Sequence, residues 1–542
     1  MGIPSYYKKL ISTVPNLIKK VHPTHGIDYL WMDFNCMIYH CLHRDDTPPY
    51  PGEHDRVNWE NNLIDEVIKY CLKVVKHVGP QSGVNICIDG VVPMAKMKQQ
   101  RLRRFKSIWL KQNSKVDTNV GPQWDSNSIT PGTDFMYRLK RRLETMSKKH
   151  TNYKWNISSS DEPGEGEHKI MNDWRKIDSI ATKHIAIYGL DADLIVLSLL
   201  NQKLLNGLNN VWLFREEINN GKVSTDSLGE EIFEWFSISE LHDHLCREFV
   251  DTTLKKQFIL DYCFAMSILG NDFLPSSLGL KIRDDGHSEL IDILTKMIND
   301  GVRIINSSDD GMNNTIDTKG LTHLFDILSS NEDVRIYEAI NKKMRMARNY
   351  GQNTENTTIE IGDNNWPLAQ IEEEIIINSG KRCLGNNWKN VYMDKLIGLP
   401  NSSHSINKLC TDYIYGIQWI WDYYCGKYDN ICFNWYYQHR LPALWSWLKN
   451  NLQMNGLCNF PNSVKYKASD IYPHEQLCMV LPFESWQLIP SCPQKKLPQI
   501  APQFFPSSFT FDSVGKRYFW ECESEIPLIS ISEVKALFNS SY

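Results

Sequence analysis

Residues 27–33, with the sequence Ile-Asp-Tyr-Leu-Trp-Met-Asp, form a short and mostly apolar run that ends in an acidic residue. The pattern recurs in residues 84–89, Val-Asn-Ile-Cys-Ile-Asp, and in residues 185–191, which also end in Asp. Each run has the length and composition of a buried strand. Between the first two, apolar residues recur at helical spacing from Trp59 to Val75. This alternation predicts an α/β fold, with a mostly parallel sheet covered by helices.

Acidic residues cluster where these strands end and in two further segments. The carboxyl ends of parallel strands meet at one edge of a sheet, so the terminal Asp residues are expected to converge there. Residues 161–169, Asp-Glu-Pro-Gly-Glu-Gly-Glu-His-Lys, hold four acids in seven positions. Residues 269–275, Leu-Gly-Asn-Asp-Phe-Leu-Pro, place an acid in an apolar setting, where a cation must compensate its charge. The predicted catalytic and metal-ligating acids are Asp33, Asp89, Glu165, Glu167, Asp191, Asp193 and Asp272.

Seven carboxylates in one pocket repel one another, and divalent metal ions relieve that repulsion. Oxygen ligands without His or Cys select Mg²⁺, for which Mn²⁺ can substitute, over zinc. Enzymes that catalyse nucleophilic displacement at a phosphate group commonly use two such ions, about 3.5 to 4 Å apart. The acids therefore predict a phosphodiesterase with two metal ions. The alternative is that each acidic segment is a solvated surface loop.

A basic cluster follows Asp89: six cations lie within residues 96–106, and no acid occurs from residue 90 to 116. The whole chain carries a formal charge of −5, so nucleic acid must be attracted by local clusters such as this one. On a helix, four side chains share one face that suits a terminal phosphate: Lys96, Gln100, Arg103 and Arg104. The alternative is a solvated cationic face. Lys98, Arg101 and Lys106 are expected at the surface or along a bound strand.

Composition limits the remaining possibilities. No apolar run approaches the roughly 20 residues that span a bilayer. The 14 cysteines include no C-x-x-C pair, which is typical of neither a zinc site nor a disulfide scaffold. The first seven residues lack the features of a signal peptide. We therefore expect an intracellular protein, cytoplasmic or nuclear, that is not secreted and has no membrane partner.

The composition changes after about residue 300, where polar segments at 306–318 and 350–365 are typical of loops or linkers. We predict a core over residues 1–350, a polar linker over 351–380 and a second region over 381–542. Aromatic residues crowd the second region between Trp419 and Tyr437. It is predicted to be mainly helical and to wrap the core.

Several long segments resemble the XRN family of 5′→3′ exoribonucleases. In the first region they are MGIPSYY from Met1, DFNCMIYHCLH from Asp33, DGVVPMAKMKQQRLRRF from Asp89, ITPGTDFM from Ile129, EPGEGEHKIM from Glu162, GLDADLIVLSL from Gly189 and LGNDFLP from Leu269. In the second region they are YGIQWIWDYY from Tyr415, FNWYY from Phe433, PHEQLCMVLP from Pro473 and FDSVGKRYFW from Phe511. The chain resembles a catalytic core with both conserved regions and without the long carboxyl-terminal extension of some members.

The resemblance implies a nuclease core of the PIN/flap-nuclease type, whose second region completes a substrate channel. It implies a processive, Mg²⁺-dependent enzyme, expected to be monomeric. The implied substrate is single-stranded RNA with a 5′-monophosphate, and the implied products are nucleoside 5′-monophosphates. The family's seven metal-site acids fall on the seven acids named above, and its 5′-phosphate ligands fall on Lys96, Gln100, Arg103 and Arg104.

The chain differs from the family at a residue that is expected to stack on the RNA bases. The family commonly stacks a His on the 5′ bases, whereas this chain has Tyr39 at that position, with His40 next to it. A tyrosine ring can also stack, at about 1 to 3 kcal/mol per base. The opposing aromatic is predicted to be Trp419 or Trp435, and the alternative is that either ring belongs to the core.

Two other functions stay open. A structure-specific, flap-type DNA nuclease also clusters acids on a parallel sheet. A non-catalytic RNA-binding protein could keep the same fold. Aromatic stacking does not distinguish RNA from DNA, whereas contacts to the 2′-hydroxyl do.

Overall fold

The chain is described by a computed structural model that covers most of its length. It describes residues 3–539 except residues 4, 25, 114–120, 178–181, 190, 203–210, 220–221, 308–313, 354–367, 369–370, 379 and 459–465. Most of the predicted linker over 351–380 therefore lies outside the described residues.

A seven-stranded sheet with the order β1-β9-β6-β5-β2-β3-β4 forms the centre of the first region. The strands are β1 (Ile18–Lys19), β2 (Tyr29–Asp33), β3 (Gly83–Cys87), β4 (Trp155–Ser158), β5 (Ile185–Tyr188), β6 (Val211–Glu216) and β9 (Phe233–Ser237). Neighbouring strands from β4 to β6 run parallel, whereas β9 runs antiparallel to β6 and to β1. The mostly parallel sheet predicted from the sequence is confirmed. The three strands predicted to end in Asp lie side by side, in the order β5, β2, β3.

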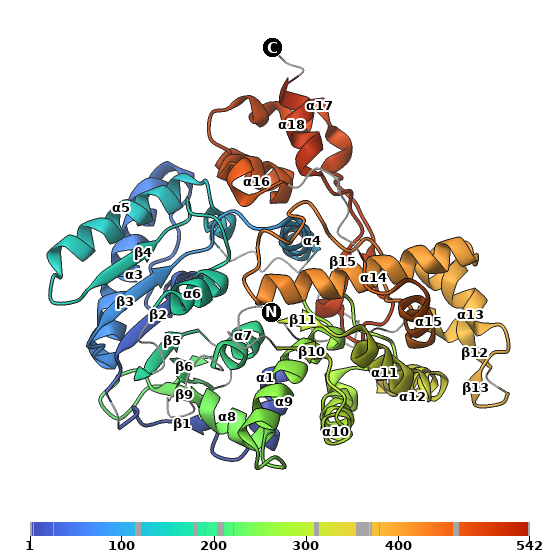
Figure 1. Ribbon diagram of the computed structural model, residues 1–542. Coiled ribbons are helices and arrows are strands. Elements are labelled where there is room, and N and C mark those ends of the chain that lie inside the picture. Colours follow the sequence, from blue (N-terminus) through green and yellow to red (C-terminus); the bar gives the residue numbers. More distant parts are fainter. Residues whose placement is uncertain are drawn as a thin grey trace.

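Helices cover both faces of this sheet (Figure 1). The helices of this first region are α1 (Tyr6–Thr13), α2 (Phe34–Leu42), α3 (Arg56–Val78), α4 (Met94–Asn113), α5 (Asp134–Lys149), α6 (Gly166–Arg175), α7 (Ala192–Gln202), α8 (Ile238–Leu245) and α9 (Thr252–Ala265), of which α4 lies apart from the sheet. Alternate residues of β2 enter different cores because successive side chains of a strand point to opposite faces. Leu30 and Met32 pack with α2, α3 and α5, whereas Trp31 stacks on Trp174 of α6 with a centroid separation of 6.3 Å.

The rest of the chain is mainly helical, which confirms the prediction made for residues 381–542. Its helices are α10 (Gly286–Asn299), α11 (Thr318–Ser329), α12 (Glu332–Asn353), α13 (Trp388–Val391), α14 (Ser403–Tyr424), α15 (Trp445–Asn455), α16 (Pro473–Val480), α17 (Leu497–Ile500) and α18 (Ile531–Asn539). Short antiparallel pairs join β7 (Ile218–Asn219) to β8 (Lys222–Val223), β10 (Ile305–Asn306) to β11 (Thr315–Ile316), β12 (Ile377–Asn378) to β13 (Cys383–Leu384) and β14 (Phe511–Asp512) to β15 (Glu523–Ser524). One hydrophobic core contains buried residues of both regions, from Leu10 to Val514.

Helix α4 lies where the sheet layer, the helices α10 to α15 and the group α16 to α18 meet (Figure 1). The carboxyl-terminal segments pack against it. Arg101 donates hydrogen bonds to the carbonyl oxygens of Pro527 and Met479, each at 3.0 Å, and Lys106 donates to that of Cys522 at 3.0 Å. The expectation that Arg101 and Lys106 lie at the surface is therefore wrong: both are buried because the second region covers this side of α4.

Within the described part of the chain, no helix is both long enough and apolar enough to cross a lipid bilayer.

Candidate metal centre and phosphate-binding face

Three of the predicted acids lie at the carboxyl ends of the central strands. Asp33 ends β2, Asp89 lies two residues beyond β3, and Asp191 follows β5. The backbone amide of Gly166 donates to Oδ1 of Asp89 at 2.7 Å, and Nδ2 of Asn35 donates to Oδ2 of Asp89 at 3.0 Å. These two bonds orient the Asp89 carboxylate toward the start of α6.

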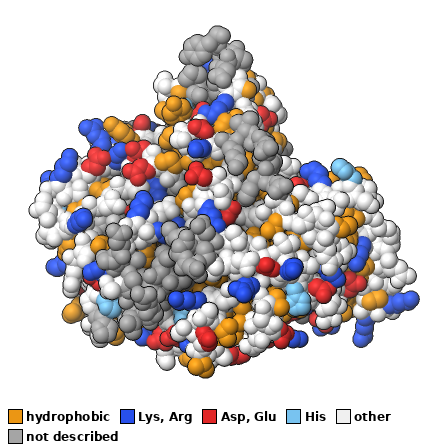
Figure 2. All heavy atoms as spheres, viewed as in Figure 1, with side chains coloured by type: hydrophobic (Ala, Val, Ile, Leu, Met, Phe, Trp, Pro, Cys, Tyr) orange, Lys and Arg blue, Asp and Glu red, His pale blue; other side chains and the backbone are white. Residues whose placement is uncertain are grey.

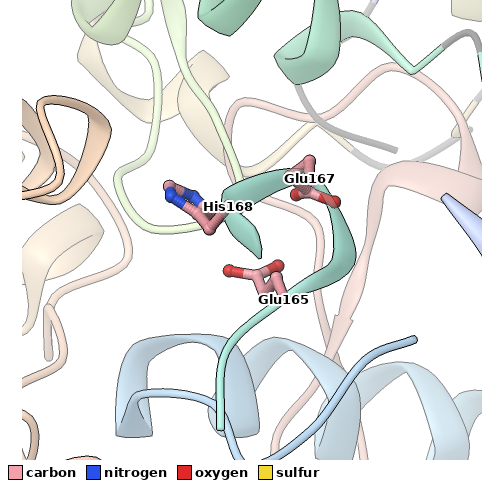
Figure 3. A group of neighbouring side chains, drawn as sticks. All are labelled: Glu165, Glu167 and His168. Atoms are coloured by element: carbon pink, nitrogen blue, oxygen red, sulfur yellow. The ribbon is translucent and has the colours of Figure 1, made fainter. Parts of the chain in front are cut away.

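The acidic loop before α6 is held against the segment that follows β3. Gly90 donates to the carbonyl oxygen of Gly164 and Gly164 donates to that of Val91, both at 2.8 Å. A Cβ at residue 90 would lie 1.7 Å from the carbonyl oxygen of Glu162, so only glycine permits this approach. The pairing places Glu165 and Glu167 beside the strand ends. Figure 3 shows both carboxyl groups and the His168 ring at the start of α6.

The remaining acids come from α7 and from the loop that follows the short helix η4 (Met266–Leu269). Asp193 lies in the first turn of α7, and Asp272 lies in the loop. Lys96 bridges the cluster: its Nζ is 2.5 Å from Oε2 of Glu165 and 2.9 Å from Oδ2 of Asp272. The cation that the apolar setting of Asp272 requires is thus Lys96, a residue that was predicted to bind phosphate.

Electrostatics show that the seven acids form one cluster. Burial, with the charges of Asp89 and Asp191, raises the pKa of Asp33 to about 8. Burial, with the charge of Asp272, raises the pKa of Asp193 to about 7. Burial and the Glu165 charge also raise the pKa of Glu167 well above its usual value. Each of the seven predicted acids thus lies within electrostatic range of at least one other of them.

Lys96 offsets part of this negative charge. Burial by itself raises the pKa of Asp272, but Lys96 together with other positive charges, Arg103 among them, outweighs burial and lowers that pKa below its usual value. One ammonium group cannot balance seven carboxyl groups. The raised pKa values of Asp33, Asp193 and Glu167 show that negative charge at these positions is still unfavourable in the chain alone.

This site can hold a metal ion. Glu165, Glu167 and His168 each offer one ligand atom, and these atoms lie within 4.8 Å of one another. The surrounding acids add hard oxygen donors, and a divalent cation would relieve the repulsion that raises their pKa values. His168 was quoted in the sequence motif but was not predicted as a ligand. Its ring is buried and packs on that of Tyr423, with a centroid separation of 3.9 Å.

Two tyrosines of α14 contact the acids, and the sequence analysis missed them. The Tyr423 hydroxyl donates to Oε1 of Glu165 at 2.8 Å, and the Tyr424 hydroxyl donates to Oδ1 of Asp193 at 3.3 Å. Both tyrosines belong to the aromatic run that was predicted only as a second unit. The aromatic-rich composition of this run marked it as unusual, but nothing in the local sequence pattern indicated that these two hydroxyl groups contact the acids.

The basic face of α4 lies next to this cluster. Arg104 donates from Nη2 to the Thr130 hydroxyl at 2.9 Å, and burial lowers its pKa to about 10. Nη1 of Arg104 and Oε1 of Gln100 are buried, and neither has a hydrogen-bond partner among the described residues. Arg103 is exposed. Burying a polar atom without a hydrogen bond costs free energy of folding, so these atoms indicate that this face binds a polar ligand.

The structure places the two predicted stacking residues of α2 in different surroundings. Tyr39 is exposed, with 38% of its surface accessible, and it lies on α2, the helix that begins directly after Asp33. The structure does not bring His40 to this face: the ring packs on Tyr70 at 4.6 Å and lies between two glutamates of the opposite core. The prediction for His40 is therefore wrong in this conformation, because its side chain leaves α2 on another side.

The two tryptophan candidates also differ. Trp419 has 0% exposure, and its indole N–H donates to the carbonyl oxygen of Cys432 at 2.9 Å, so it is a core residue and the stacking prediction for it is wrong. Trp435 is half-buried against Trp419, with ring centroids 5.2 Å apart. It stays a candidate for stacking.

The outer surface does not repeat this local concentration of charge. On the face shown in Figure 2, basic and acidic side chains of the described residues are interspersed. This agrees with the weak net charge of −5. The positive charge on α4 is therefore a local concentration in a chain whose net charge is weakly negative.

Two family models match this chain. The XRN 5′-3′ exonuclease N-terminus matches residues 1–217, and the Xrn1 helical domain matches residues 381–540. A 5′-3′ exoribonuclease 1 of Homo sapiens is 27% identical over 98% of this chain and 33% of that protein. A 5′-3′ exoribonuclease 2 of Kluyveromyces lactis is 32% identical over 54% of this chain and 36% of that protein. The chain thus spans about a third of the length of these two relatives.

Among solved structures, the catalytic core of Rad2 in complex with DNA substrate is similar at 10% identity and a TM-score of 0.31. That alignment covers 62% of this chain and 75% of the other, and it adds nothing to the assignment at this score. The two family models together match more than half of the residues, in the order expected. The chain therefore belongs to the XRN family of 5′-3′ exonucleases.

Proposed function

We propose that this protein is a processive 5′→3′ exoribonuclease that acts on single-stranded RNA with a 5′-monophosphate and releases nucleoside 5′-monophosphates. The observation that supports this proposal most strongly is one juxtaposition. Seven acids from separate segments lie beside a basic helix face on which the buried donor Nη1 of Arg104 lacks a partner among the described residues. A substrate that would contact both the acidic cluster and the basic face is one with a terminal phosphate next to the phosphodiester bond that is cleaved.

Recognition of the 5′ end is assigned to one face of α4. Arg104 is fixed by Thr130 and keeps Nη1 free of partners among the described residues, so it can donate to a phosphate oxygen. Exposed Arg103 adds a second guanidinium, and Gln100 adds an amide donor. Lys96 belongs both to the basic face of α4 and to the acidic cluster, because its side chain extends from this face and contacts Glu165 and Asp272. A face that binds one phosphate selects against caps and triphosphates by volume and charge.

The acids are assigned to metal binding. We propose that Asp33, Asp89, Glu165, Glu167, Asp191, Asp193 and Asp272 hold two Mg²⁺ ions, for which Mn²⁺ can substitute. When bound, such ions activate a water nucleophile and stabilise the leaving oxygen. The chain's own residues prepare the site for them. Gly166 and Asn35 orient Asp89, whereas Tyr423 orients Glu165.

Base stacking is assigned to Tyr39 and Trp435. Tyr39 is exposed on α2, the helix that begins directly after Asp33, so its ring is accessible to a base of a nucleotide bound beside the acids. Trp435 projects from the second region and is half-buried. Stacking tolerates every base, which suits an enzyme that must advance one nucleotide at a time.

The test is to identify the products from RNA that is phosphorylated at its 5′ end and labelled along its length. Mononucleotides released from that end, in the presence of Mg²⁺, are expected. Asp193→Ala should abolish turnover while RNA binding is retained, and Asp300→Ala, at an exposed acid directly after α10, is the matched control. Internal fragments, or an Asp193→Ala variant with a near-native rate, would overturn the proposal.

The same assay separates the alternative functions. Single-stranded RNA, single-stranded DNA and a DNA flap are compared at equal concentration. Preference for the flap would identify a structure-specific DNA nuclease. Binding of RNA without any metal-dependent digestion would identify a non-catalytic RNA-binding protein.

We also propose that the protein acts as a monomer in the cytoplasm or nucleus. All fourteen cysteines are free in the structure, as expected for a reducing compartment. Sedimentation of the purified chain tests the monomer, and microscopy of a tagged chain tests the location.

A further inference from the structure

A cavity of about 770 Å³ lies on a second side of α4, away from Arg104 and Thr130. Its wall is formed by α4, by the loop that carries Asp272, and by the segment from β14 to β15 with the residues that follow it. We call this cavity the cationic chamber. Small-molecule sites typically enclose about 300 to 1,000 Å³, so the chamber can hold a nucleotide.

Positive charge in the chamber is in excess. Five cations of its wall form no ion pair within 4 Å among the described residues: Lys98, Arg103, Lys106, Lys281 and Lys516. Three other cations of the wall are in ion pairs, namely Arg283, Arg440 and Arg517. Among the described carboxylates of the wall, Glu523 is the one outside any ion pair. Counted as formal charges, the wall holds eight Lys and Arg side chains against five Asp and Glu side chains, an excess of three positive charges.

At two of these cations burial outweighs the nearby carboxylates, whereas at Lys516 the carboxylates outweigh burial and raise the pKa. Burial lowers the pKa of Lys106 to about 8, and burial also lowers that of Lys281 to about 8. Lys106 donates to the carbonyl oxygen of Cys522 at 3.0 Å and lies 4.4 Å from the centroid of the Phe519 ring. Carbonyl oxygens and an aromatic face satisfy its hydrogen atoms but do not neutralise its charge. A bound anion would supply that missing charge.

The chamber also offers apolar surface beside the charge. Phe273, Tyr436 and Trp520 belong to its wall, and Lys98 lies 5.9 Å from the Tyr436 ring centroid. A ligand that combines an anionic group with a flat ring system fits this combination. A nucleoside monophosphate has both.

The chamber borders the candidate active site. Asp272, one of the seven acids, and Arg103, on the phosphate-binding face, both belong to its wall. A processive exonuclease must release each nucleotide while the shortened RNA stays bound in the entry channel. The product therefore needs a path that the RNA does not occupy.

We propose that the cationic chamber is the product site, which receives the released nucleoside 5′-monophosphate before it leaves the protein. This inference rests on the proposed exonuclease function. The phosphate pairs with Lys516, Lys98 and Lys106, and the base packs on the aromatic wall without selection for its identity.

The experiment measures binding of adenosine 5′-monophosphate to the full chain without metal, by isothermal titration. Arg104→Ala serves as the background, because it weakens binding at the phosphate-binding face. Lys516→Ala in that background removes a chamber cation whose charge is acted on by Glu523 and Asp512 but which makes no ion pair within 4 Å among the described residues. Its affinity is expected to fall at least about tenfold, as for the loss of a charge-assisted hydrogen bond. Lys256→Ala, at an exposed lysine of α9, is the matched control.

Two further measurements separate loss of the chamber site from loss of the fold and from binding of the base alone. Lys516→Arg should restore the affinity, which a folding defect would not allow. Adenosine without a phosphate should bind far more weakly than the nucleotide. Inorganic phosphate that binds as tightly as the nucleotide would overturn the assignment to a nucleotide, and unchanged affinity in Lys516→Ala would overturn the chamber itself.

Failure of this inference and failure of the proposed function are distinguishable, because the titration needs no turnover. A chain that degrades RNA from the 5′ end but binds the nucleotide equally well with Lys516→Ala has no product site in the chamber. A chain that binds the nucleotide in the chamber but does not degrade RNA is not the proposed exonuclease.

Discussion

Tyr423→Phe removes a hydroxyl that the second region contributes to the acids of the first. The hydroxyl donates to Oε1 of Glu165 at 2.8 Å, and both residues are buried. A hydrogen bond to a charged group contributes about 1.5 to 3 kcal/mol, and an unpaired buried acceptor keeps its full desolvation cost. Each factor of ten in affinity corresponds to about 1.4 kcal/mol, so divalent metal should bind about 10 to 100 times more weakly.

The direction of the pH effect follows from the same contact. Burial raises the pKa of Glu165, whereas Lys96 and the Tyr423 hydroxyl both lower it. Without the hydroxyl, that pKa rises further, and protons compete more strongly with metal for the carboxylate. The difference between the variant and the wild type should therefore grow as the pH is lowered.

The assay is isothermal titration of the full chain with Mn²⁺ at two pH values. Tyr413→Phe is the matched control, since Tyr413 lies on the same helix, has 0% exposure and has no hydrogen-bond partner for its hydroxyl among the described residues. Equal metal affinity of Tyr423→Phe and Tyr413→Phe would refute the assigned role of the contact.

Three further predictions follow from single contacts. Arg104→Ala should narrow the ratio of degradation rates for 5′-phosphate and 5′-hydroxyl RNA by about tenfold or more, and an unchanged ratio would contradict the phosphate-binding face. Gly90→Ala places a Cβ 1.7 Å from a carbonyl oxygen of the acidic loop, so thermal unfolding should show a loss of about 1 to 3 kcal/mol, whereas Gly121→Ala, with nothing within 4 Å, should be neutral. Burial raises the pKa of Asp261 from 3.8 to about 7, so the folded state keeps a proton that the unfolded chain releases, and stability falls by up to about 1.4 kcal/mol per unit as the pH rises between these values. Asp261→Asn should reduce that slope in urea denaturation at pH 5 and pH 7, and an unchanged slope would disprove the assignment.

Local patterns were sufficient for the strands and for the acids. The apolar runs that end in Asp33 and Asp89 correspond to β2 and β3, and the helical spacing from Trp59 corresponds to α3. Because parallel strands present their carboxyl ends at one edge, the convergence of these acids could be predicted before any coordinates. Strand β4 was missed because its polar residues lack the apolar run of the other central strands.

Side-chain direction could not be predicted in the same way. His40 and Tyr39 are neighbours on α2, yet Tyr39 is exposed while His40 packs on Tyr70. Trp419 and Trp435 have similar sequence surroundings, but only Trp435 keeps accessible surface. Which side of a helix becomes a channel wall depends on the elements that pack against it.

The sequence by itself determined the sheet, its row of terminal carboxylates and the basic helix, because each depends on periodicity and on chain direction within one segment. The tertiary structure alone decided which partners these groups receive. Lys96 lies between Glu165 and Asp272, Tyr423 reaches Glu165 from the second region, and Arg101 is sealed under the carboxyl-terminal segments. Such contacts join residues far apart in the chain, and burial sets their strength, so they exist only once the two regions have packed together.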